Sequence, residues 1–174
     1  LHWEEARVRR EKGDPEGAMR ALELVTEIEP EHVGALALTG EIFIRRGMYA
    51  EAADRLARLS RAQSAPAMNR VTAGVTAVDL YENKLDRFDL ALDVLNSLHD
   101  QGLSTLPVRE RLARAAARTG SWSDATRILE ELMLERPTPE GRVEAARLAA
   151  AIHRDRLNEP FGAMPALQKL LQEI

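Results

Sequence analysis

Apolar residues recur at steps of three and four along most of the chain, which is the period of an amphipathic helix. Between residues 15 and 28 they fall on one helical face, at Ala18, Ala21, Leu22, Val25 and Ile28. Asp14 suits the cap of this segment, and Pro15 suits its first helical position. The pattern predicts helices over residues 15–28, 33–46, 49–62, 107–119, 123–135 and 140–156. No segment shows convincing strand alternation, so we expect an all-α protein of antiparallel helix pairs.

The aromatic residues recur at a regular spacing. Tyr49, Phe88, Trp122 and Phe161 follow one another at intervals of 39, 34 and 39 residues, and we expect each to open a helix. Alanine stands three residues after each of the first three, at Ala52, Ala91 and Ala125. Gly47 and Gly120 end the preceding helices in two cases. Recurrence at this period is typical of a repeat protein, in which function lies on a stacked surface.

The residues of two units carry a resemblance to the tetratricopeptide repeat family, whose 34-residue unit contains two helices. One unit matches through Leu36, Thr39, Gly40, Phe43, Tyr49, Ala52, Leu56 and Leu59. A second matches through Leu112, Ala113, Ala116, Gly120, Trp122, Ala125, Leu129, Leu132 and Pro137. The resemblance implies a single domain over residues 1–174, a right-handed superhelix of five hairpins. Their approximate bounds are 1–32, 33–66, 67–105, 106–139 and 140–174.

Two units depart from the 34-residue length. Extra residues lie between about Val78 and Arg87, and again between Ala150 and Phe161. We expect longer first helices or projecting loops there. Gly40 and Gly74 occupy the same position in successive units, where the lack of a side chain lets two helices approach closely.

The composition of the chain narrows the range of possible functions. The net charge of −4 and pI near 5.7 argue against nucleic-acid binding, which usually needs clustered basic residues. The chain has no cysteine, no apolar run long enough to span a membrane and no signal-peptide pattern. Leu1 is not a natural start, so we expect a fragment of a longer protein. The compartment stays open, with the cytoplasm favoured.

No catalytic pattern is present. The motifs HExxH, GxSxG and GxxxxGK are absent, and the histidines, His2, His32, His99 and His153, have no metal-ligand spacing. We therefore predict neither an enzyme nor a cofactor or metal site. The expected function is a scaffold that binds a protein or peptide.

The resemblance implies a concave groove lined by the first helix of each unit. In this sequence the groove positions are Ala37, Glu41, Ile44, Arg45, Val71, Val75, Val78, Asp79, Glu110, Arg114, Arg118, Glu144 and Leu148. An apolar middle flanked by arginine suits a peptide with apolar anchors beside acidic residues. The alternative is that the valines belong to the core and that Arg114 and Arg118 merely pair with Glu110.

Two other functions stay open. The last helix carries apolar residues with no polar helix after it, which favours self-association or continuation into further repeats: Phe161, Leu167, Leu170, Leu171 and Ile174. Pro165 either delays the start of this helix or kinks it. An RNA-reading helical repeat has a similar period, but the acidic pI and irregular insertions count against it.

Overall fold

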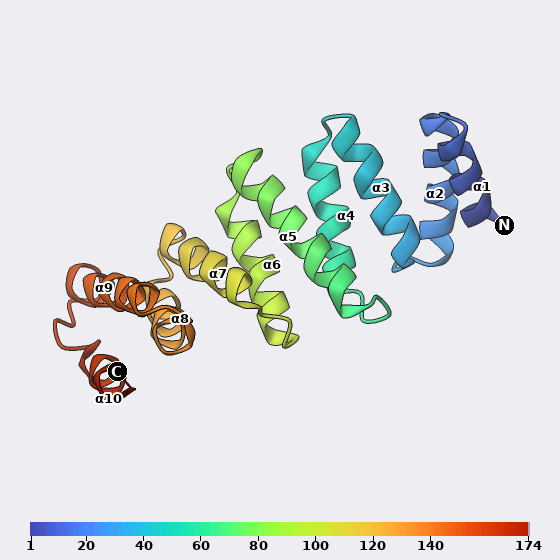
Figure 1. The fold of residues 1–174 in the computed structure, drawn as a ribbon. Helices are drawn as coiled ribbons and strands as arrows, with labels where there is room; N and C mark the ends of the chain where they lie inside the picture. Colours follow the sequence, from blue (N-terminus) through green and yellow to red (C-terminus); the bar gives the residue numbers. More distant parts are fainter. Residues whose placement is uncertain (174) are drawn as a thin grey trace. The chain divides into compact units, whose positions relative to one another are not determined.

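The computed structural model describes residues 1–173, except for the side chains of residues 169 and 173. Within this range the chain forms ten helices and no strand (Figure 1). The helices group into two compact units, Leu1–Leu98 and His99–Ile174, which are described separately. Ile174, which the sequence assigned to an apolar terminal face, lies outside the described residues.

The first unit contains three successive helical hairpins (Figure 1). Their helices are α1 (His2–Glu11), α2 (Pro15–Ile28), α3 (Val33–Arg45), α4 (Tyr49–Arg61), α5 (Ala67–Asn83) and α6 (Phe88–Asp100), whose last two residues follow the division between the units. The second unit contains α7 (Leu106–Arg118), α8 (Trp122–Glu135), α9 (Pro139–Asp155) and α10 (Met164–Glu173). Below, α1, α3, α5, α7 and α9 are called first helices, and the others second helices.

The predicted all-α fold of helical hairpins is confirmed, and the six helices predicted by range begin and end within one residue of the observed bounds. The assignment of the whole chain to one domain stays a prediction.

Helices approach closely where the sequence places its glycines. A methyl group at Gly40 would lie 3.0 Å from Leu56 of α4. A methyl group at Gly74 would lie 2.8 Å from Leu98 of α6 and 3.2 Å from Ser60 of α4. All three separations are shorter than normal van der Waals contact, so these glycines set the spacing between α3 and α4 and between α5 and its two neighbours.

The extra residues of the third and fifth hairpins lengthen their first helices. Helices α5 and α9 have 17 residues each, whereas α3 and α7 have 13. The turns differ as well. Gly47 and Gly120 take the left-handed conformation after the short helices, whereas Asp86 and Asn158 take it after the long ones. Asp and Asn tolerate this conformation better than other side chains do.

Each long helix also places a cation over the aromatic ring of the preceding hairpin. Lys84 Nζ lies 5.5 Å from the ring centroid of Tyr49, and the Arg156 guanidinium lies 4.9 Å from the ring centroid of Trp122. Such contacts stabilise by about 0.5–1 kcal/mol at exposed sites. Both pairs lie within a single unit, so each ties two successive hairpins together.

The prediction that Phe161 opens the last helix is wrong. Phe161 is 77% exposed, and α10 begins three residues later, at Met164. Pro165 is the second residue of α10, and a proline deeper in a helix would clash with the carbonyl four residues earlier. Pro165 therefore delays the start of the helix and leaves Phe161 in the turn.

The fifth hairpin repeats the third at a spacing of 72 residues. Ala146 corresponds to Gly74, Asn158 to Asp86 and Leu170 to Leu98. The members of each pair share burial or backbone conformation. This register places Pro160, not Phe161, opposite Phe88, so the 39-residue spacing of Phe161 is a coincidence.

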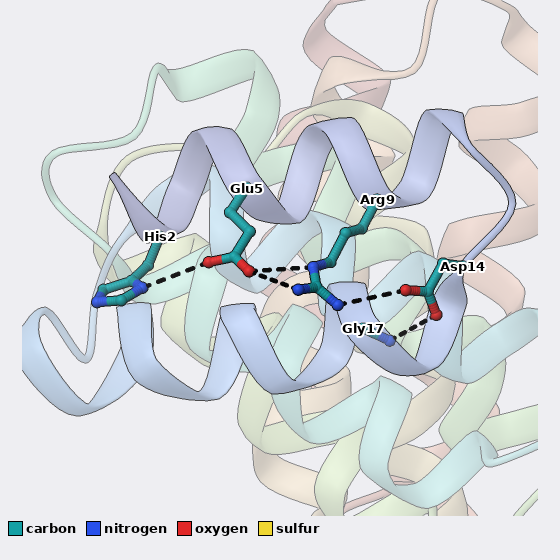
Figure 2. Close-up of polar contacts among 5 residues, drawn as sticks. All are labelled: His2, Glu5, Arg9, Asp14 and Gly17. Atoms are coloured by element: carbon teal, nitrogen blue, oxygen red, sulfur yellow. Dashed lines mark hydrogen bonds and ion pairs between the residues drawn. The ribbon is translucent and has the colours of Figure 1, made fainter.

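A chain of polar contacts closes the first hairpin (Figure 2). The carboxylate of Glu5 lies 3.7 Å from His2 and 2.8 Å from Arg9, and Arg9 in turn lies 3.4 Å from Asp14. Asp14 accepts a 2.8 Å hydrogen bond from the backbone N–H of Gly17 in the first turn of α2. The predicted cap is confirmed, and it joins the end of α1 to the start of α2.

The cap makes stability depend on pH. The pKa of Asp14 lies below its usual value of 3.8, chiefly because its carboxylate accepts the Gly17 bond, with a smaller contribution from Arg9. A lowered pKa stabilises the folded chain above the usual carboxyl range, and this stabilisation is lost as the pH falls through the folded-state value. We expect Asp14→Ala to lower the denaturation midpoint at neutral pH and to approach wild type in acid.

Chemical denaturation over a pH series measures this difference. Asp14→Asn is the control, because asparagine caps the helix without a titrating charge. A wild-type advantage over Asp14→Ala that stays the same at every pH would contradict this role for the carboxylate.

Candidate functional site

In the first unit, the predicted groove residues lie on α3 and α5. Ala37 and Arg45 are exposed, whereas Glu41, Ile44, Val71, Val75 and Asp79 are half-buried. Val78 is 0% exposed. It belongs to the core, as the alternative interpretation of the valines proposed, and it cannot contact a ligand. Its neighbours Val71 and Val75 keep part of their surface open.

Glu41 connects two first helices. Its carboxylate accepts two hydrogen bonds from Arg10 of α1, at 2.8 and 2.9 Å, and lies 2.7 Å from Arg45 of α3. Arg10 is not among the groove residues predicted from the sequence. The repeat period contained the signal, because Arg10 stands 34 residues before the predicted groove position Ile44.

A pocket of about 310 Å³ lies beside this network. It is lined by Arg10, Gly13, Pro15, Ile42, Arg45 and Arg46. Arg46 pairs with Glu16 at 2.8 Å. Three guanidinium groups therefore share two carboxylates, Glu16 and Glu41, beside the exposed ring of Pro15. This hollow, called the arginine pocket below, combines an apolar contact with excess positive charge.

In the second unit, one arginine joins two predicted groove residues. Arg136, between α8 and α9, lies 3.0 Å from Glu110 and 3.2 Å from Glu144. The sequence pattern gave no signal for Arg136, which stands outside the helices. Arg114, Arg118 and Leu148 are exposed. Much of the acidic part of the predicted groove thus has partners inside the protein.

The second unit also has an apolar pocket of about 480 Å³ between α9 and α10. Arg147 is the one charged side chain among its described lining residues, most of which are apolar: Val143, Ala146, Ala150, Met164, Leu167, Leu170 and Leu171. Leu167, Leu170 and Leu171 belong to the apolar terminal face predicted from the sequence, whereas the contribution of α9 was not predicted.

His153 fastens α9 to its surroundings. Its ring nitrogens lie 3.1 Å from Glu159 and 3.0 Å from Glu130 of α8. A methyl group at Gly162 would lie 2.3 Å from the ring, so this glycine makes room for it. The two carboxylates lie on opposite ring nitrogens and do not converge on a common point. His153 therefore has a structural role, because it links α9 to α8 and to the segment that follows α9.

Residues 1–173 include no cluster of three His, Asp or Glu side chains arranged to hold a metal ion. In the same range, no helix combines the length and apolar character needed to cross a membrane.

Comparison with known proteins identifies the repeat. Residues 9–73 match the model of the tetratricopeptide repeat. The structure of MamA is similar, with 19% sequence identity and a TM-score of 0.52 over 98% of this chain and 88% of that one. YrrB, described as a TPR protein with an unusual peptide-binding site, gives 18% identity and a TM-score of 0.55 over 98% and 84% of the respective chains. A search of curated proteins gives no match.

The resemblance to the tetratricopeptide repeat family is confirmed by the repeat match and by the fold of these structures. Proteins of this family are generally non-catalytic scaffolds. The repeat match and the similarity to these two structures support a general function as a protein-interaction scaffold.

The burial of Val78 gives a test that separates core from surface. We expect Val78→Ala to lower the free energy of unfolding by about 2 kcal/mol, because it removes two buried methyl groups and leaves a cavity. Val75→Ala, on the same helix but half-buried, is expected to cost less than about 1 kcal/mol. Chemical denaturation of both variants measures the difference. Equal costs would contradict the placement of Val78 in the core.

Proposed function

We propose that this chain, which has the tetratricopeptide-repeat fold and matches the repeat at residues 9–73, is a non-catalytic scaffold that binds a protein segment along its first helices. The observation that carries the proposal is the arginine pocket of the first unit. It lies where Arg45, a groove residue predicted from the sequence, meets Arg10 of the neighbouring first helix.

The charges of this pocket favour an acidic ligand. Arg10 and Arg45 share Glu41, and both arginine side chains are substantially exposed. Exposed ion pairs stabilise a protein by only about 0–1 kcal/mol, so their partners exchange at little cost. A carboxylate from a ligand can take over one guanidinium while Glu41 keeps the other, and the planar guanidinium group suits such recognition.

The apolar part of the pocket adds a second requirement. The exposed Pro15 offers an apolar contact next to the guanidinium groups, whereas Ile42 is only 6% exposed and belongs to the core. We therefore assign the ligand class as a peptide segment with an apolar anchor beside an acidic residue. Val71 and Val75 of α5 offer further partly open apolar surface in the same unit.

A second candidate function is assembly through the last hairpin. The observation that favours it is the apolar pocket between α9 and α10, where Met164 and Leu171 are exposed. Exposed apolar surface of this kind marks interaction sites in folded proteins.

Selection from a library of random peptides displayed on phage tests the first candidate. We expect enriched peptides to pair an acidic residue with a neighbouring apolar one. Synthetic versions of the enriched peptides should bind the Arg45→Glu variant about tenfold more weakly than the wild type, or weaker still. The substitution replaces attraction between Arg45 and the acidic residue of the peptide by repulsion between two carboxylates.

Arg20→Glu on α2 is the matched control, since Arg20 is an exposed arginine outside the pocket. It makes the same change in net charge, and we expect it to leave binding unchanged. Thermal melts of all variants confirm folding. Selected peptides that bind Arg45→Glu as tightly as wild type would refute the assignment of the pocket.

A further inference from the structure

Arg70 lies near the start of α5, on the side of that helix that packs against its neighbours. It stands four residues before Gly74, so the two residues share a helical face. An added methyl group at Gly74 would meet Leu98 and Ser60, which places this face between packed helices. Arg70 is only 9% exposed, and it is the one buried arginine among residues 1–173.

The guanidinium group of Arg70 has no partner inside the part of the protein that the structure describes. Its Nε–H is enclosed and makes no hydrogen bond with any described residue. No described carboxylate forms an ion pair with it either. A buried charge without a counter-charge costs stability, because it loses hydration and gains no attraction in return.

The other hairpins show what this position in the repeat holds. Arg70 corresponds to Leu36 of α3, 34 residues earlier, and to Arg109 of α7, 39 residues later. Leu36 is 0% exposed, and Arg109 pairs with the carboxylate of Glu135 in α8. The residue of the third hairpin that corresponds to Glu135 is Gln101, 34 residues earlier, which is a neutral amide. The repeat thus supplies a carboxylate for this arginine in the fourth hairpin and replaces it in the third.

The fifth hairpin also provides an oxygen acceptor at this position. Arg142 stands 72 residues after Arg70, and its Nε–H donates a 2.7 Å hydrogen bond to the backbone carbonyl of Arg136. The arginines of the fourth and fifth hairpins therefore each bind an oxygen atom of the protein. Arg70 has the same donors without such an acceptor among the described residues, which is the arrangement expected of a site that a ligand completes.

The start of α5 adds further donors beside Arg70. Its N-cap residue, Pro66, provides no side-chain cap, and the next three residues, Ala67, Met68 and Asn69, are exposed. The backbone N–H groups of these three residues have no acceptor within the helix. Side chains lean toward the N-terminal end of a helix, so the Arg70 side chain extends back toward these N–H groups. The guanidinium charge and the partial positive charge of the helix start both favour an anion there.

We infer that Arg70 and the first turn of α5 bind a carboxylate of the protein segment that this scaffold holds. This inference deepens the proposed function and rests on it. A carboxylate has two acceptor oxygens in one plane, so it can accept hydrogen bonds from a guanidinium and from a backbone N–H together. The pair of Arg109 with Glu135 shows that the chain itself uses a carboxylate at the equivalent position. Met68, which is 74% exposed, offers an apolar contact to the neighbouring part of the ligand.

NMR spectra of the nitrogen-labelled full chain observe the arginine Nε–H groups directly. The signal of Arg70 is assigned by its loss in Arg70→Lys. Two probes are titrated separately: N-acetylglycine, whose carboxylate is a chain end, and the α-amide of N-acetylaspartate, whose carboxylate is a side chain. We expect at least one probe to shift the Arg70 signal saturably. The probe that binds more tightly identifies the source of the carboxylate.

Two controls make the result specific. Arg20 is an exposed arginine of α2, and we expect its signal to show no saturable shift with either probe. Inorganic phosphate tests whether another oxyanion is preferred. A saturable shift of the Arg70 signal with phosphate but with neither carboxylate would overturn the inference. The absence of a saturable shift with all three probes would overturn it as well, since water alone would then satisfy the guanidinium.

Chemical denaturation gives a second readout, with a matched variant from the same position of the repeat. We expect Arg70→Met to raise the denaturation midpoint, because methionine keeps an apolar stem and removes the unpaired charge. Arg109→Met should lower the midpoint, because it leaves the carboxylate of Glu135 without its partner. A midpoint for Arg70→Met below that of wild type would overturn the inference, since Arg70 would then have a partner inside the protein.

The Arg70 site and the proposed function can fail separately. If no carboxylate probe shifts the Arg70 signal while the selected peptides still require Arg45, the Arg70 site is wrong and the proposed function stands. If the selected peptides also bind Arg45→Glu as tightly as wild type, the proposed function falls with it.

Discussion

Close contact between helices through small residues is the constraint on which the rest of this structure depends. Gly74 lies at such a contact with both Leu98 and Ser60, and Gly40 with Leu56. Ala18, Ala52, Ala91 and Ala125, which recur through the repeat, are 0% exposed. Because the helices pack closely, most leucines of the second helices are buried, and the stability of each unit comes from many short-range contacts between neighbouring hairpins.

This packing also decides where function resides. Side chains between neighbouring helices are committed to the core, as Val78 is, so only side chains outside these contacts are open to a ligand. Among the described residues, such side chains gather in the arginine pocket beside α1 and α3 and in the apolar pocket between α9 and α10. The two pockets differ in chemistry, because three arginines line the first, whereas mostly apolar side chains line the second.

The sequence predicted the helices well because their apolar period and their caps are local features. For example, Asp14 caps α2 through the backbone N–H of Gly17, and Pro15 is its first residue, so all the residues that fix its start are adjacent in sequence. The prediction failed where longer-range packing decides the outcome. Phe161 matched the aromatic spacing, but Pro165 delays the helix behind it. Val78 matched a groove position, but its neighbours bury it. Arg136 joins Glu110 to Glu144 from outside the helices, so no periodicity pointed to it.

A double-mutant cycle on Gly74 and Leu98 tests the central claim most directly. The free energy of unfolding is measured by chemical denaturation for wild type, Gly74→Ala, Leu98→Ala and the double variant. Close contact predicts that the added methyl group is more harmful beside Leu98 than beside alanine, with a coupling energy of about 1 kcal/mol or more. The helix-propensity gain of alanine over glycine cancels within the cycle. Strictly additive effects would contradict the claim that this contact sets the helix spacing.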